Sequence, residues 1–201
     1  MKEQRDYIQD IAEIRSMMER SSKFVSLSGW AGILAGIYAL SGSLAAYSLF
    51  GFNPDELSYT SRNLSDVILL AIGVLFLALI MAIYLSQRKA RSKNENNWNT
   101  TSKHLLSSMA IPLLSGGVLI MILLSHGLTG LAAPLSLIFY GLALVNAGHF
   151  TIPEVKIMGI VQITLGLLST WFIEYGLILW AIGFGAVHII YGIYMHFRYE
   201  R

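Results

Sequence analysis

Three polar residues interrupt long apolar stretches of the sequence and are the first candidates for chemistry. Gln162 and His188 lie nearest the centres of their stretches, and Asn146 lies closer to one end. A polar side chain inside a membrane is costly and needs a partner, so it often marks a substrate or proton site. Counting from the stretch ends places the three at similar depth. Either they form a substrate or proton site, or each is satisfied locally and holds the helices in register.

Three other histidines, His104, His149 and His196, map to the same ends of their stretches, and Glu154 follows His149 closely. Imidazole and carboxylate groups on separate helices can bind a transition metal. No histidine pair has His-x-x-x-His spacing, however. We predict no metal and no cofactor, with these three histidines as the weak candidates for a metal site.

Motifs of common enzymes are missing from the sequence. There is no G-x-S-x-G, no H-E-x-x-H and no Walker-type glycine loop. The absence of cysteine excludes disulfides and thiol catalysis. No basic run is interleaved with aromatic residues, so we expect no nucleic-acid partner. The sequence therefore predicts no catalytic residues.

The apolar stretches are the elements that must position these side chains. Hydrophobic residues make up 55% of the 201 residues and charged residues 13%, against about 25% charged in soluble domains. A helix of about 20 residues crosses the roughly 30 Å of hydrocarbon, and the stretches lack the alternation of barrel strands. We predict six membrane-spanning helices, at Phe24–Phe50, Asp66–Ser86, His104–His126, Thr129–Phe150, Val155–Ile173 and Gly176–Phe197.

The basic residues are distributed unevenly around these six predicted spans. Thirteen of the fourteen Lys and Arg residues fall on one side, and Arg62 alone falls on the other. Loops on the cytoplasmic side of a membrane are enriched in Lys and Arg. We therefore expect a multi-pass membrane protein with both termini in the cytoplasm.

Two connections carry helix-start signals. Asn53-Pro54-Asp55-Glu56 resembles a helix N-terminus with proline at its first position, which predicts a short interfacial helix. Thr151 and Glu154 have the spacing of a capping box before the fifth span.

Residues 1–23 predict a separate amphipathic helix. Tyr7, Ile11, Ile14 and Met18 recur at helical spacing and form an apolar seam. Five basic and five acidic residues accompany this seam, whereas a helix built for anionic lipid carries mostly basic residues. The helix either lies on the inner membrane surface, pairs with a second copy or binds another protein.

Small residues mark one face of the first span. Gly29, Gly32 and Gly36 allow another helix to approach closely. Such a face serves either internal packing or a homodimer.

The N-terminal region resembles the opening of a group of uncharacterised small bacterial multi-pass integral membrane proteins. Residues 7–24, from Tyr7 to Phe24, and the following Leu27-Ser28-Gly29 carry the resemblance. It implies a bacterial inner-membrane protein, and it brings no activity and no site with it.

Together these patterns predict an all-α, polytopic membrane protein: a six-transmembrane-helix bundle with an N-terminal cytoplasmic amphipathic helix. Its expected segments are the helix at 1–23, spans one and two at 24–86, a basic linker at 87–103, spans three to six at 104–197 and a tail at 198–201. We expect a non-enzymatic protein that acts in the lipid bilayer through helix–helix interaction, as a sensor, regulator or assembly partner. The alternative is a small transporter or channel with its site at Gln162, His188 and Asn146, and an intramembrane enzyme ranks third.

Overall fold

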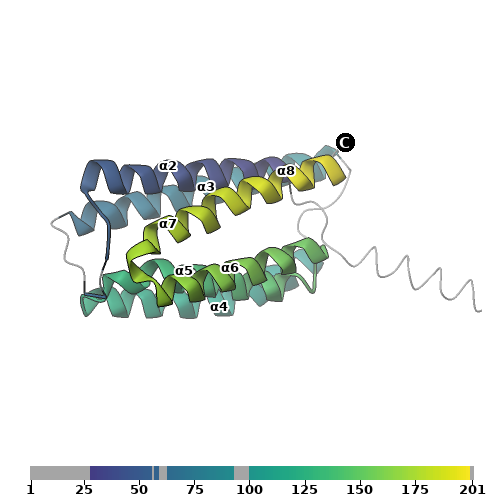
Figure 1. The fold of residues 1–201 in the computed structure, drawn as a ribbon. Helices are drawn as coiled ribbons and strands as arrows, with labels where there is room; N and C mark the ends of the chain where they lie inside the picture. Colours follow the sequence, from purple (N-terminus) through teal and green to yellow (C-terminus); the bar gives the residue numbers. More distant parts are fainter. Residues whose placement is uncertain (1–27, 56, 59–62, 93–99, 200–201) are drawn as a thin grey trace, which may run out of the picture.

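The computed structural model describes residues 28–55, 57–58, 63–92 and 100–199, and the described part of the chain is all-helical, as predicted (Figure 1). The predicted amphipathic helix, with Tyr7, Ile11, Ile14 and Met18, lies outside the described residues, as do residues 93–99 of the basic linker. The main helices are α2 (Gly29–Phe50), α3 (Leu64–Ser92), α4 (Thr100–Ser125), α5 (Ala132–Ala147), α6 (Pro153–Trp171), α7 (Gly176–Trp180) and α8 (His188–Tyr199).

Among the residues that the structure describes, five helical segments are long and apolar enough to cross a membrane. They are Gly29–Phe50, Leu64–Lys89, Thr101–Ser125, Thr129–Ala147 and Ile173–Tyr199. Helix α6 is 19 residues long but carries Glu154 and Lys156 near its start, and it is not among the five. The chain is thus a helical membrane protein, while the sixth span stays a prediction.

The helices form two layers. Helices α2, α3 and α8 lie in one layer, and α4, α5 and α6 lie in the other (Figure 1). The chain passes from the second layer back to the first through η2 (Ile173–Tyr175), α7 and the π-helical segment η3 (Ala181–Val187). Helix α8 therefore packs on α2, far from it in sequence, and closes the bundle.

Glycines allow two helix pairs to pack closely. A methyl group added to Gly29 would lie 2.5 Å from the Gly192 carbonyl oxygen, and one on Gly36 would lie 2.6 Å from the Gly185 oxygen. Gly32 faces Gly192 Cα, 3.2 Å from such a methyl group. The small face of the first span thus packs against α8 and η3 of the same chain. This face was expected to serve either internal packing or a homodimer, and the structure shows internal packing.

The same packing joins α5 to α6. An added methyl group on Gly141 would lie 2.6 Å from the Gly159 oxygen, and one on Gly159 would lie 2.7 Å from the Gly141 oxygen. Helices in lipid associate partly through such close packing, because no hydrophobic effect drives them together there.

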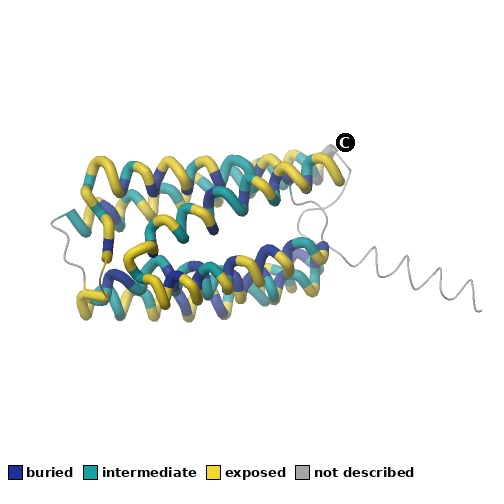
Figure 2. Tube along the Cα trace, in the orientation of Figure 1, coloured by how far each residue is buried: buried dark blue, intermediate teal, exposed yellow. Residues whose placement is uncertain are grey.

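Exposed residues lie along the outer faces of the bundle (Figure 2), and many of them are large and apolar. Leu69 on α3 is 69% exposed, Ile111 on α4 is 76% exposed and Trp171 on α6 is 83% exposed. Soluble proteins seldom expose contiguous apolar surface of this extent. Lipid is the solvent that matches such a surface.

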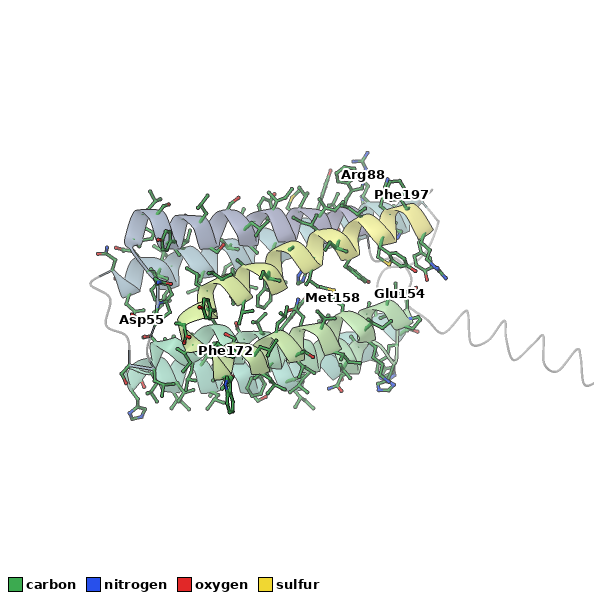
Figure 3. The ribbon with its side chains drawn as sticks, viewed as in Figure 1. Asp55, Arg88, Glu154, Met158, Phe172 and Phe197 are labelled. Atoms are coloured by element: carbon green, nitrogen blue, oxygen red, sulfur yellow. The ribbon has the colours of Figure 1, made fainter. Side chains whose placement is uncertain are left out.

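Charged side chains separate to the two ends of the bundle. All described basic residues lie at one end, where α3 and α8 finish and α4 and α6 begin: Arg88, Lys89, Arg91, Lys103, Lys156 and Arg198. Three of the described acidic residues, Asp55, Asp66 and Glu174, lie at the opposite end. Figure 3 labels Arg88 and Glu154 at the first end and Asp55 at the second. We call these the basic end and the acidic end.

The described residues of the first connection form no interfacial helix, and the capping box predicted at Thr151 and Glu154 does not form, although a helix does begin there. Residues 51–55 form no helix and residues 57–58 form a turn. Instead the connection reaches the second layer, where the Leu57 carbonyl oxygen accepts a hydrogen bond from the Gly130 N–H at 3.1 Å. Helix α6 has Ile152, and not Thr151, as its N-cap. Proline at the first helical position begins this helix, since its φ angle suits a helix and its missing N–H would have no intrahelical partner there, and no side chain caps it.

Candidate functional site

The last span is a broken helix, and the break is at the predicted site. The regular α-helix is interrupted by the π-helical segment η3 between α7 and α8. Segments of π-helix are rare and often occur at functional sites. Gly183 and Gly185 lie inside this one, and glycine weakens regular helix. The break leaves the Gly183 carbonyl group available to side chains.

Gln162 and His188 meet at this carbonyl group. The Gln162 Nε2 atom donates a hydrogen bond to the Gly183 oxygen at 2.7 Å, and the His188 Nδ1 atom lies 3.0 Å from the same oxygen. Gln162 comes from α6 and is fully buried; His188 is the first residue of α8 and is buried. Two of the three predicted site residues are therefore brought together.

The hydrogen bonds determine which ring nitrogen of His188 carries the proton. A carbonyl oxygen only accepts, so Nδ1 is the donor toward Gly183. In the neutral ring Nε2 is then an acceptor, and it receives the hydroxyl hydrogen of Tyr140 across 2.9 Å. Tyr140 on α5 thus holds the Nε2 side of the His188 ring in place through this hydrogen bond. We call Gln162, His188 and Tyr140, with the Gly183 carbonyl group, the polar cluster.

Aromatic rings cover the polar cluster on the side of the acidic end. The Phe184 ring lies 5.0 Å from the rings of both Trp180 and Tyr140, and 5.8 Å from the His188 ring. Trp180 in turn donates its indole N–H to the Ser136 hydroxyl oxygen at 3.1 Å. Phe184 and Trp180 belong to the broken span, and Tyr140 belongs to α5, so the rings join these two elements beside the cluster.

One polar atom of the cluster has no partner. The Gln162 Oε1 atom is buried and accepts no hydrogen bond among the described residues. Leaving a buried acceptor unpaired costs about 1–3 kcal/mol. Such an atom can receive a hydrogen bond from a bound molecule.

Asn146 lies apart from the polar cluster. Its side chain is exposed, and its Nδ2 atom lies 3.5 Å from the Ser108 carbonyl oxygen on α4. It is the penultimate residue of α5, near the basic end, whereas Gln162 is in the middle of α6, and its side chain faces α4. Tyr140 takes the place that Asn146 was expected to fill. The sequence signal for Tyr140 was its neighbour Gly141, which marks the part of α5 that packs closely on α6.

The other histidines make contacts with aromatic rings. His104 stacks on Phe150 with ring centroids 6.0 Å apart, and His196 lies 5.6 Å from the Trp30 ring. His149 is exposed after the end of α5. Within the described ranges, no group of three or more His, Cys, Asp or Glu side chains is placed to hold a metal ion.

Long apolar helices around a buried polar centre define a polytopic helical membrane protein. Comparisons with family models, curated proteins and solved structures give no match. The function therefore has to be inferred from the chemistry of the site itself.

Proposed function

We propose that this chain is a small transporter or channel that passes a small uncharged solute carrying a hydrogen-bond donor, and that it is not an enzyme. The observation that supports this function best is the buried, unpaired Oε1 atom of Gln162 beside the broken span. A donor group of the solute would pair with this atom. The neighbouring Nε2 atom stays on Gly183 and holds the amide in place.

The charge distribution favours an uncharged solute. The charged side chains of the described residues lie at the two ends of the bundle, whereas the polar cluster is formed by an amide, a phenol and a neutral imidazole. A charge inside the membrane needs a partner of opposite charge. The polar cluster contains no charged group that could pair with a charged solute.

The proposed topology has six spans with the basic end in the cytoplasm of a bacterial cell. Clustering of the described Lys and Arg residues at one end supports this orientation. Helix α6 packs along α5 in the same layer, and its 19 residues cover about 28 Å at the helical rise. That length supports α6 as the sixth span.

The architecture also supports movement of a solute. Transporters commonly bind their substrates near the middle of the membrane, at interrupted helices between two halves of the fold. Here η3 is the interruption, and the polar cluster joins α5 and α6 of one layer to the last span, which continues into the other.

The other hypothesis, action through helix–helix interaction alone, draws less support. Its apolar seam lies outside the described residues. Its glycine face is covered by α8 of the same chain.

Uptake by vesicles tests the proposed function. The purified chain is reconstituted into liposomes, and the entry of urea and glycerol is followed by stopped-flow light scattering. We expect wild-type vesicles to admit at least one of the two faster than protein-free liposomes, and Gln162→Leu to lose this increase. The fold should persist, because His188 still donates to the Gly183 oxygen.

Thr164→Val is the matched control, because it alters an exposed polar residue on the same helix. Gel filtration and circular dichroism check that each variant is folded. If Gln162→Leu does not fold, Tyr140→Phe replaces it, since only the hydroxyl group on His188 is lost. Wild-type uptake at the rate of empty liposomes, or variants as fast as wild type, would overturn the proposal.

A further inference from the structure

Leucine side chains close the space in front of the unpaired Gln162 oxygen. The position that a Cβ atom would take on Gly183 lies 2.6 Å from the Gln162 Oε1 atom and 2.5 Å from the Leu137 Cδ2 atom. The Leu165 Cδ1 atom lies 3.4 Å from the same point. A non-bonded carbon atom keeps about 3.5–4.0 Å from its neighbours. This point is therefore closed to a solute while Leu137 stays where it is.

Leu137 lies on the acidic side of the polar cluster. It is fully buried on α5 and precedes Tyr140 by three residues, so both belong to one face of this helix. Helix α5 begins at the acidic end of the bundle, which places Leu137 nearer to that end than Tyr140. An apolar side chain thus lies directly beside the polar cluster, on the side from which a solute at the acidic end would arrive.

Ser169 carries a second unpaired oxygen, nearer to the acidic end. Its side chain is fully buried, and its Oγ atom has no hydrogen-bond partner among the described residues. Ser169 follows Gln162 by seven residues, so both lie on one face of α6, about 10 Å apart along its axis. A Cβ atom on Gly176 would lie 3.7 Å from Ser169 Oγ and 3.9 Å from the Ala133 Cβ atom. The Ser169 hydroxyl group therefore lies where α5, α6 and α7 come together.

The packing of α5 on α6 places Leu137 between the two unpaired oxygens. Gly166 lies between the two oxygen-bearing residues of α6. A Cβ atom on Gly166 would lie 2.9 Å from both the Pro134 oxygen and the Ile138 nitrogen. Residues 134–138 of α5 thus lie beside this part of α6, and Leu137 is one of them.

We propose that Leu137 is the size barrier that a solute passes between an outer binding position at Ser169 and the inner one at Gln162. This inference rests on the proposed function, because it describes how the solute reaches Gln162 from the acidic end. The end of a leucine side chain can move between rotamers, and Gly183 adds no side chain of its own to the constriction. The barrier therefore opens by movement of one side chain.

The two oxygens and the barrier together define the class of solute. A serine hydroxyl group can donate or accept a hydrogen bond, whereas the Gln162 Oε1 atom only accepts. A solute with an N–H or O–H group can pair with each oxygen in turn, which offsets the loss of its hydrogen bonds to water. The leucine methyl groups exclude larger molecules. Small uncharged amides and short polyols fit these requirements.

Selectivity by solute size tests the barrier. The purified chain is reconstituted into liposomes, and the entry of urea, glycerol, erythritol and xylitol is followed by stopped-flow light scattering. We expect Leu137→Ala to raise the entry of erythritol and xylitol roughly tenfold over wild type, and that of urea and glycerol by a smaller factor. A larger molecule needs a wider opening, so it gains more from the shorter side chain.

Leu142→Ala is the matched control for the barrier variant, because Leu142 lies on the same helix and is 40% exposed. It should keep the wild-type selectivity. Gln162→Leu added to Leu137→Ala should abolish the gain for the larger solutes, which separates passage through the site from a general leak. If Leu137→Ala does not fold, Leu137→Val replaces it with a side chain that is one carbon shorter.

Ser169→Ala tests the outer binding position. It removes a hydroxyl group that makes no hydrogen bond among the described residues, so a purely structural role predicts unchanged stability and unchanged uptake. We expect the entry of the solutes that wild type admits to fall severalfold, with their order by size unchanged because Leu137 remains. Thermal unfolding in detergent checks that the variant is as stable as wild type.

The outcomes for the barrier and for the proposed function can be told apart. Wild-type selectivity in the Leu137 variants would overturn the inference, as would wild-type uptake in Ser169→Ala or entry of large solutes that does not need Gln162. Uptake that needs Gln162 while Leu137→Ala keeps the wild-type selectivity would remove the barrier and keep the proposed function. Wild-type vesicles no faster than empty liposomes would remove both.

Discussion

The two glycine-packed helix pairs, α5 with α6 and α2 with α8, use the same contact for different purposes. In both pairs the missing side chains bring a glycine against a carbonyl group of the partner helix. The first pair is a hairpin of neighbouring helices, and its helices are regular. The second pair joins α2 and α8, the first and last of the described main helices. Helix α2 also packs against the π-helical segment η3, which precedes α8.

The polar cluster is divided between the regular α5–α6 hairpin and the irregular last span. The regular hairpin supplies Gln162 and Tyr140, so these side chains are held by a stiff pair of helices. The irregular span supplies the Gly183 carbonyl group and His188. A polar cluster built on one rigid side and one interrupted side can rearrange on the interrupted side while the other stays in place.

A bulky side chain at Gly159, in the middle of the α5–α6 hairpin, should reduce the free energy of unfolding most. A Cβ atom at Gly159 would lie 2.7 Å from the Gly141 oxygen and 2.8 Å from the Val145 nitrogen, so Gly159→Val forces two backbones apart. We expect a loss of about 3 kcal/mol, measured by unfolding in mixed detergent micelles. Gly73→Val, where nothing lies within 4 Å of an added Cβ, should unfold with wild-type stability. A similar loss in both variants would contradict the proposed contact.

The same substitution at the second pair should cost less. Gly29 also faces backbone atoms, with the Gly192 oxygen 2.5 Å from an added Cβ atom, but it is the first residue of α2. The end of a helix can move aside more easily than its middle. We expect Gly29→Val to lose about 1–2 kcal/mol in the same assay. A loss larger than that of Gly159→Val would show that α2 and α8, and not the hairpin, are the stiffer pair.

Substitution within the interrupted segment should be milder still. A Cβ atom on Gly183 would meet the Leu137 Cδ2 atom at 2.5 Å and the Gln162 Oε1 atom at 2.6 Å, and both are ends of side chains. We expect Gly183→Ala to cost about 1 kcal/mol and to reduce solute uptake by displacing the Gln162 amide. Unchanged uptake would argue that Oε1 does not face the solute.

Asn146 should show the smallest effect. Its side chain is exposed and its one hydrogen bond among the described residues is long, at 3.5 Å. We expect Asn146→Ala to change stability by less than about 0.5 kcal/mol and to leave solute uptake unchanged in the vesicle assay. A strong loss of uptake would restore Asn146 to the site.

The helical class and the meeting of Gln162 with His188 could be predicted from the sequence, because apolar length fixes the spans and counting from their ends fixes depth. Depth does not say which way a side chain points around its helix, so Asn146 was included and Tyr140 was missed. The π-helical segment adds a further shift. One extra residue in a turn rotates every later residue by about 100°, and this changes which face of α8 meets α2.

The pairing of α8 with α2 could not be predicted from the sequence pattern, which grouped spans three to six in one segment, at 104–197, apart from the first two spans. Glycines were visible in both helices, but their partners were not. Small residues indicate close packing without naming the helix that will approach.

The hydrogen bond from the Gly130 N–H to the Leu57 oxygen has a mechanical consequence. It fastens the first layer to the second at the acidic end, where the chain also crosses between layers through η2 and α7. At the basic end the side chains of Glu154, Arg198 and Tyr199 join α6 to α8. The two layers are thus linked at both ends, by the backbone at the acidic end and by side chains alone at the basic end, so single substitutions can loosen the basic end without breaking the chain's own crossing.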